Sequence, residues 1–183
     1  MPIFLFLLQI LPYAGPISGG LREGMALYLQ GVVPTNADRF AINFKTGSSK
    51  TDDTAFHFNP RMGSNVAMNS FRDGKWESAE SVSDNPFKKG EAFKMFMVIK
   101  SEGYQIYVNG KEQYTFKHRI PLEKVSALNI NGDVAVNLFG FIQVSYIFYS
   151  CGNIAALLKL YQNPVRMKWN VSFLNTLSLC SPN

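Results

Sequence analysis

Apolar and polar residues alternate along the middle of the chain, and such alternation is typical of half-buried β-strands. Runs of this kind are separated by turn signals built from Gly, Asn, Asp, Ser and Pro. The clearest turn is Asn109-Gly110, since both residues tolerate the positive φ of a type I′ hairpin. No stretch of about 12 residues shows a helical repeat. The alternating runs are Leu27–Gln30, Phe40–Phe44, Ala55–Asn59, Ala92–Ile99, Tyr104–Val108, Tyr114–Phe116 and Val134–Leu138.

About ten short strands without a long helix predict an all-β fold, either an antiparallel sandwich or a barrel. The length of 183 residues fits one domain, and an apolar fraction of 46% is enough for a folded core. The two cysteines, Cys151 and Cys180, both lie near the C-terminal end. We therefore expect neither a disulfide framework nor a cysteine metal site in the main domain, and a bond between the two stays open.

The two ends of the chain differ from its middle. Residues 1–11 form an apolar extension in which Ile3–Leu11 has the length of a signal-peptide core, but positive charges before it and a clear cleavage site are missing. Residues 144–183 form a tail with several apolar runs, none of which reaches the roughly 18 residues of a membrane span. We expect no integral membrane span and leave the structure of both ends open.

The net charge of +5 comes from 18 Lys and Arg against 13 Asp and Glu. Three of the cations, Lys159, Arg166 and Lys168, belong to the tail, which has no acid. The main domain is therefore nearly neutral. Because nucleic-acid binding needs a clustered basic stripe, we expect no nucleic-acid partner.

Enzymatic chemistry has little support in the sequence. There are two histidines, His57 and His118, and no nucleophile elbow, phosphate-binding loop or zinc-protease motif. The carboxylate pair Asp52-Asp53 lies in a polar loop-like segment. We expect no catalytic residues, no metal site and no cofactor.

One constellation does suggest binding. Because His57, Asn59 and Arg61 alternate along a strand, their side chains share one face of the sheet. Asn69 and Trp76 follow on the next strand pair. Imidazole, carboxamide and guanidinium groups supply fixed donors and acceptors for sugar hydroxyls, and an indole packs well against the apolar C–H face of galactose. This pattern predicts a sugar-binding face.

These residues form part of a longer ordered pattern, by which the chain resembles the galectins, the β-galactoside-binding lectins. The resemblance implies a jelly-roll sandwich of two antiparallel sheets over residues 12–143, with residues 1–11 and 144–183 as additional segments. The matching stretches are Pro12–Ile17, Gly31–Pro34, Arg39–Phe44, His57–Arg61, Asn69-Ser70, Trp76, Pro86-Phe87, Tyr104–Gly110, Tyr114–Arg119 and Asn131–Val134.

The resemblance implies reversible, metal-free binding of galactose-containing glycans and glycoproteins, without catalysis. By the family pattern, His57, Asn59 and Arg61 would hydrogen-bond galactose, chiefly at its axial 4-hydroxyl. Asn69 would hold the 6-hydroxyl, and Trp76 would stack under the ring.

The family also suggests where such a protein is found and how it assembles. Galectins are typically made in the cytosol and exported by an unconventional route, and secretion through Ile3–Leu11 stays the alternative. A homodimer is left open. The resemblance gives His118 and Arg119 a structural role.

One departure falls inside the expected site. Galectins usually have Trp-Gly-x-Glu-x-Arg, whereas Trp76 begins the run Trp-Glu-Ser-Ala-Glu-Ser. Ala79 thus replaces a sugar-binding Glu that would pair with Arg61, and Ser81 replaces an Arg. Glu80 is the neighbouring candidate ligand, although strand alternation turns it away unless a bulge intervenes.

We expect a retained galactose preference with weakened or altered disaccharide affinity. The alternative is a galectin-fold protein with a degenerate sugar site that acts as a structural or protein-interaction domain.

Overall fold

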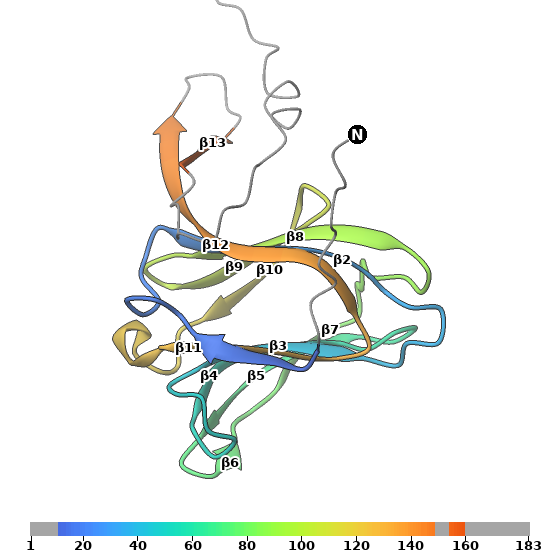
Figure 1. Ribbon diagram of the computed structural model, residues 1–183, viewed down its shortest axis with the longest axis horizontal. Helices are drawn as coiled ribbons and strands as arrows, with labels where there is room; N and C mark the ends of the chain where they lie inside the picture. Colours follow the sequence, from blue (N-terminus) through green and yellow to red (C-terminus); the bar gives the residue numbers. More distant parts are fainter. Residues whose placement is uncertain (1–10, 149–153, 160–183) are drawn as a thin grey trace, which may run out of the picture.

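The computed structural model describes residues 11–148 and 154–159, so Cys151, Cys180 and most of the terminal segments lie outside the described residues. The fold consists of two antiparallel sheets stacked as layers (Figure 1). One sheet has seven strands in the order β1-β11-β3-β4-β5-β6, with β7 also paired to β5, and the other has six in the order β10-β9-β8-β2-β12-β13. The bounds are β1 (Tyr13–Pro16), β2 (Met25–Val32), β3 (Phe40–Lys45), β4 (Thr54–Pro60), β5 (Val66–Arg72), β6 (Lys75–Trp76), β7 (Glu80–Val82), β8 (Ala92–Ile99), β9 (Gly103–Val108), β10 (Lys111–Lys117), the 3₁₀ helix η1 (Leu122–Lys124), β11 (Ala127–Gly132), β12 (Ala135–Phe148) and β13 (Ile154–Lys159).

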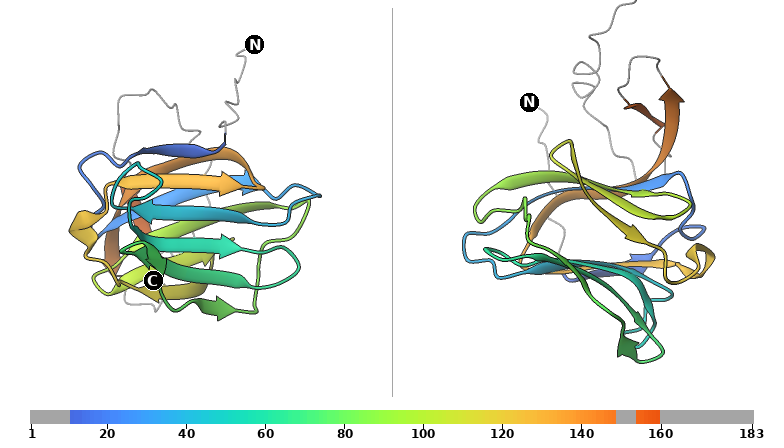
Figure 2. Two further views of the ribbon diagram at one scale, coloured as in Figure 1. Left: turned by 90° about the horizontal axis from the view of Figure 1, so that it is seen from below. Right: turned by 180° about the vertical axis from the view of Figure 1, so that it is seen from behind.

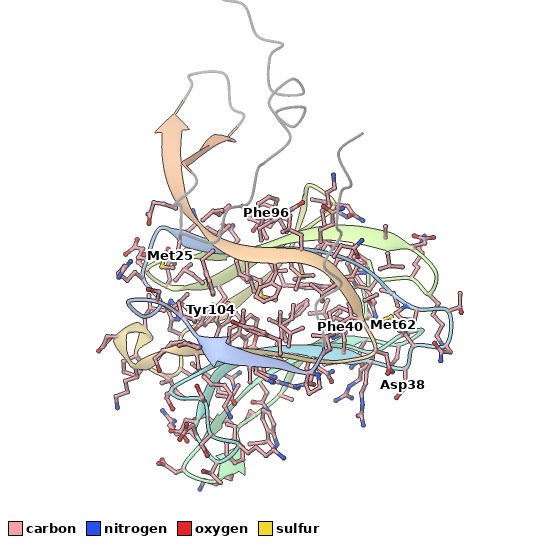
Figure 3. All side chains as sticks on the ribbon, in the orientation of Figure 1. Met25, Asp38, Phe40, Met62, Phe96 and Tyr104 are labelled. Carbon is pink, nitrogen blue, oxygen red and sulfur yellow. The ribbon has the colours of Figure 1, made fainter. Side chains whose placement is uncertain are left out.

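The expected all-β sandwich of two antiparallel sheets is confirmed, and alternation along the strands explains it. In β4, Phe56 and Phe58 are fully buried in the core, so His57 between them faces the outer side of the sheet. The core is rich in aromatic rings, and Phe40 and Tyr104 lie between the two layers (Figure 3). Tyr104 stacks on Phe56 with the ring centroids 4.6 Å apart. Burying each such ring contributes roughly 1.5–3 kcal/mol.

Two tight turns determine how strands return along the sheets. Asn109 and Gly110 have φ values of 50° and 82° between β9 and β10, which confirms the expected hairpin turn. Asp73 and Gly74, with φ values of 53° and 78°, form a similar turn between β5 and β6. This second turn places Trp76 directly across from Phe71.

β12 is longer than the sequence pattern predicted. The resemblance implied a sandwich that ends at residue 143, whereas β12 continues to Phe148. Its pairing with β2 ends at Gln143 opposite Met25, and from Gln143 onward it pairs with β13. The apolar residues that follow Gln143 are compatible with an extended strand, which explains the difference. Within the described ranges, no helix is long and apolar enough to cross a membrane.

Candidate functional site

The candidate site lies on the outer face of the seven-stranded sheet, where β3, β4 and β5 run side by side (Figure 2, left). His57 on β4 is opposite Asn43 on β3 and Asn69 on β5. Asn59 follows two residues later on the same face. Arg61 comes directly after β4 and forms an isolated bridge with Arg39. The strand register therefore brings His57, Asn59 and Asn69, which were predicted from the sequence, to one face of the sheet.

Trp76 completes this face. Its ring centroid lies 4.9 Å from that of His57, at an interplanar angle of 56°, and Phe71 packs edge-on against it at 5.3 Å. The residue is 53% exposed, and it is the only large hydrophobic residue exposed in the described part of the chain. An indole held from the side and open to solvent offers apolar surface to a ligand.

A chain of hydrogen bonds determines the tautomer of His57. The carbonyl oxygen of Tyr13 accepts from Asn129 Nδ2 at 2.9 Å, which turns Asn129 Oδ1 toward Asn43. Asn43 Nδ2 donates to that oxygen at 2.9 Å, so Asn43 Oδ1 faces His57 Nδ1 at 2.6 Å. Because a carboxamide oxygen only accepts, Nδ1 carries the proton and Nε2 keeps its lone pair. His57 thus offers an acceptor to a ligand hydroxyl.

The electrostatics keep this imidazole neutral. Burial, together with the positive charge of Arg61, lowers the pKa of His57 to about 4. At neutral pH the ring therefore carries no charge and retains its acceptor.

Asn59 and Arg61 are coupled to each other. Asn59 Nδ2 donates to the carbonyl oxygen of Phe40 at 2.7 Å, and Asn59 Oδ1 accepts from Arg61 Nε at 3.1 Å. These bonds orient the carboxamide and occupy one nitrogen of the guanidinium. None of the salt bridges found among the described residues includes Arg61.

Asn69 is held even more firmly. Its Oδ1 accepts from the main-chain N–H of Ser70 at 2.8 Å and from Arg119 Nη1 at 3.2 Å, while its Nδ2 donates to the carbonyl oxygen of Glu77 at 2.9 Å. One N–H of Nδ2 stays uncommitted, so Asn69 presents a donor. Arg119 therefore supports a site residue, a specific contact within the structural role that the resemblance implied.

A β-bulge separates β6 from β7. Trp76 is opposite Phe71 and Glu80 is opposite Met68, so three residues of one strand face only two of β5. After the bulge, Ser81 lies opposite Ala67 on the outer face. Glu80 lies instead on the same side as Met68, whose side chain is in the core.

The structure does not place Glu80 with the other candidate residues. Its carboxylate pairs with Arg119 Nη2 at 2.7 Å, and Glu77 lies 3.7 Å from the same guanidinium. Glu77 also pairs with Arg72. Alternation back from Ser81 places Ala79 on the outer face, so the residues that face the site from this segment are neutral.

Two hollows flank the cluster. One, of about 270 Å³, adjoins His57 and Trp76, and the other, of about 340 Å³, lies near Arg61. Within the described ranges, no three His, Cys, Asp or Glu side chains are grouped to hold a metal ion. The first hollow is lined by Asn43, Lys45, Lys50, Thr54, His57, Phe71, Trp76, Asn129 and Asn131, and the second by Gly63, Ser64, Ser83, Asn85, Phe87, Lys88 and Lys89.

Comparisons with known proteins cover the same region. Residues 12–141 match the family described as galactoside-binding lectin. The chain is 42% identical over 134 residues to galectin-4 from Bos taurus, covering 72% of this chain and 40% of that protein. It is 34% identical over 127 residues to galectin-7 from Homo sapiens, covering 69% of this chain and 93% of that protein.

The fold is also similar to solved structures. A variant of human galectin-16 superimposes with a TM-score of 0.70 at 27% sequence identity, covering 74% of this chain and 98% of that chain. The chain spans about two-fifths of the length of the galectin-4 relatives that it matches.

Proposed function

Because the chain belongs to the galactoside-binding lectin family, the galectins, we propose that its sandwich reversibly binds β-galactoside-containing glycans without a metal ion. The family consists of lectins and not of enzymes. One observation carries the proposal: the neutral His57 acceptor lies beside the exposed indole of Trp76 and shares its face with Arg61.

The chemistry of the cluster fits an axial 4-hydroxyl. Such a hydroxyl can donate to His57 Nε2 while its oxygen accepts from the guanidinium of Arg61. Asn69 can donate to the 6-hydroxyl, and Trp76 can cover the apolar face of the ring. An equatorial 4-hydroxyl would leave His57 and Arg61 unpaired, and unpaired polar groups in a binding site carry a large penalty.

Disaccharide binding should be weaker than in a site with an acidic residue beside Arg61. Ala79 and Ser81 offer no charge-assisted partner on the outer face. Losing one or two such bonds, at about 1.5–3 kcal/mol each, corresponds to a roughly ten- to hundredfold or larger loss of affinity.

The lack of a charged partner at Ala79 and Ser81 also favours a second candidate function, a protein-interaction domain with a degenerate sugar site. In this case substitutions at His57 and Trp76 would leave partner binding unchanged. For either function we propose a protein found in the cytosol and, by unconventional export, outside the cell, with conventional secretion and homodimer formation as the open alternatives.

Calorimetric titration of the full chain with methyl β-galactoside and with methyl β-glucoside tests the proposal. We expect binding of the galactoside, no detectable binding of its 4-epimer, and loss of galactoside binding in Trp76→Ala. Lys117→Ala, on the other sheet, is the matched control and should bind normally. Equal binding of the two epimers, or undiminished binding by Trp76→Ala, would contradict the proposal.

A further inference from the structure

The guanidinium of Arg61 is only partly used by the protein. Its Nε donates to Asn59, and no carboxylate of the described residues forms an ion pair with it. Arg39, which lies across the isolated bridge from Arg61, does have an acidic partner, because the carboxylate of Asp38 lies 3.9 Å from its Nε. An arginine in a binding face with free N–H groups is suited to a planar anionic group, which it can bind through two parallel hydrogen bonds.

The neighbouring strand does not supply that anion. The bulge turns Ala79 and Ser81 to the outer face, and Ser81 accepts a hydrogen bond from Asn65. Glu77 and Glu80 form ion pairs with other arginines: Glu77 pairs with Arg72 and lies close to Arg119, and Glu80 pairs with Arg119. The carboxylates of this segment therefore form their ion pairs with Arg72 and Arg119 and not with Arg61.

The hollow beside Arg61 is also free of acids. Asn85 Nδ2 donates to the carbonyl oxygen of Arg61 at 2.8 Å, which ties the wall of the hollow to the site. Lys88 and Lys89 are exposed and line it, and its lining includes no Asp or Glu. Asp133 is close enough to Lys89 for an electrostatic interaction. Its carboxylate already accepts hydrogen bonds from the main-chain N–H groups of residues 38 and 39.

The spacing along β4 shows which part of a ligand reaches this region. His57 and Arg61 are four residues apart, roughly 13 Å between their backbones in an extended strand, and the Arg61 side chain turns back to Asn59, so its guanidinium can meet both a galactose over His57 and the unit that follows it. A galactose that lies over Trp76 and His57 therefore leaves its next unit near Arg61 and the hollow with Lys88 and Lys89.

We propose that the site selects galactosides whose second unit carries an anionic group, either a carboxylate or a sulfate ester. The inference rests on the proposed galactoside binding. The anion pairs with Arg61, in the place where the protein offers no carboxylate of its own, and the two lysines add longer-range attraction.

Titrating the full chain with lactobionate and with lactitol isolates the charge, since both carry galactose on an open-chain second unit and differ in a carboxylate. We expect lactobionate to bind about tenfold more tightly, the size of one charge-assisted pair, with the difference shrinking as salt is added. N-acetyllactosamine with and without a sulfate on its second unit forms the sulfate arm. A preference in one arm alone assigns the anion to that chemistry.

Two pairs of variants locate the effect. Ala79→Glu places a carboxylate on the outer face of this segment and should abolish the preference, whereas Ala79→Gln should keep it. The double variant Lys88→Gln with Lys89→Gln should reduce the preference for lactobionate over lactitol two- to threefold, on the order expected of screened surface charges. Lys111→Gln on β10 should not change this preference.

Equal binding of lactobionate and lactitol, with no preference in the sulfate arm, would overturn this inference while methyl β-galactoside binding still upholds the proposed function. Failure of every galactoside, lactobionate included, would overturn both. A preference that survives Ala79→Glu would overturn the assignment to Arg61.

Discussion

Two arginines lie on either side of the segment that joins β6 to β7, and their surroundings differ. Arg119 is 20% exposed in its side chain, pairs with Glu80, lies close to Glu77 and stacks over the ring of Phe116 at 4.6 Å. Arg61 is exposed on the outer face and has no such acidic partner among the described residues. The segment is therefore anchored on its inner side by the ion pairs of Arg119, and toward Arg61 on its outer side it offers no ion-pair partner among the described residues.

Removing Arg119 should have the largest effect on this comparison. Arg119→Ala would leave Glu80 without its partner and release Asn69, so we expect a loss of about 3 kcal/mol in the free energy of unfolding together with weaker galactoside binding. Urea denaturation and calorimetry measure the two effects. Arg119→Lys should recover part of the stability and little of the support for Asn69. Unchanged galactoside affinity in Arg119→Ala would show that Arg119 does not position the site.

Lowering the pH tests the contribution of His57, on the outer face of the sheet, to the stability of the protein. Its pKa is about 4 in the folded protein and near 6.5 when unfolded, so the unfolded chain takes up a proton first as the pH falls. This contribution to stability is complete above pH 6.5 and is lost progressively down to pH 4, up to about 3 kcal/mol. Urea denaturation at several pH values measures it, and His57→Gln should flatten the curve in this window. An equally steep curve in the variant would contradict the assignment.

Restoring charges on the outer face should sharpen the contrast between the arginines. Ala79→Glu combined with Ser81→Arg should raise the affinity for neutral lactose about tenfold. Ala79→Gln combined with Ser81→Gln is the uncharged control for calorimetry. If lactose affinity does not rise, the missing acid partner of Arg61 is not the cause of weak disaccharide binding.

The smallest effect is expected for a single exposed carboxylate on the inner side. Glu80→Gln weakens one contact of Arg119, and because Glu80 is 47% exposed in its side chain the cost should be only about 0.5 kcal/mol. Thermal unfolding beside Glu123→Gln, an exposed control in η1, measures it. A loss several times larger would mean that Glu80, and not Glu77, is the main anchor of Arg119.

Much of the fold follows from alternation, because each strand has one buried face. The runs containing Phe40, Phe56 and Tyr104 predicted β3, β4 and β9 close to their observed bounds. β11 was not predicted from its pattern, since its outward positions are asparagines, which have low strand propensity. The extension of β12 was missed because it depends on pairing with β13.

The site was predictable where residues are local in sequence. His57, Asn59 and Arg61 share a face through simple alternation, and the structure brings Asn69 and Trp76 beside them. The supporting residues were not predictable because they come from distant strands. Asn43 contacts His57, and Asn129 contacts Asn43, only through the register of β3, β4 and β11, and Arg119, two residues after β10, donates to Asn69. A polar residue on the outer face of an otherwise apolar strand, such as Asn43, was the available signal.

The bonds that run from Tyr13 through Asn129 and Asn43 to His57 make strand β1 part of ligand discrimination. A main-chain carbonyl near the start of the sandwich thus helps to determine which ring nitrogen of a distant histidine carries the proton. Trimming β1 would therefore leave each sugar-contacting side chain in the chain but remove one of the two hydrogen bonds that orient Asn129, the other being the donation from Asn131 Nδ2 to Asn129 Oδ1 at 2.6 Å. The less favoured tautomer of His57 would then be populated more often, and the preference between hydroxyl orientations would weaken before the site lost its shape.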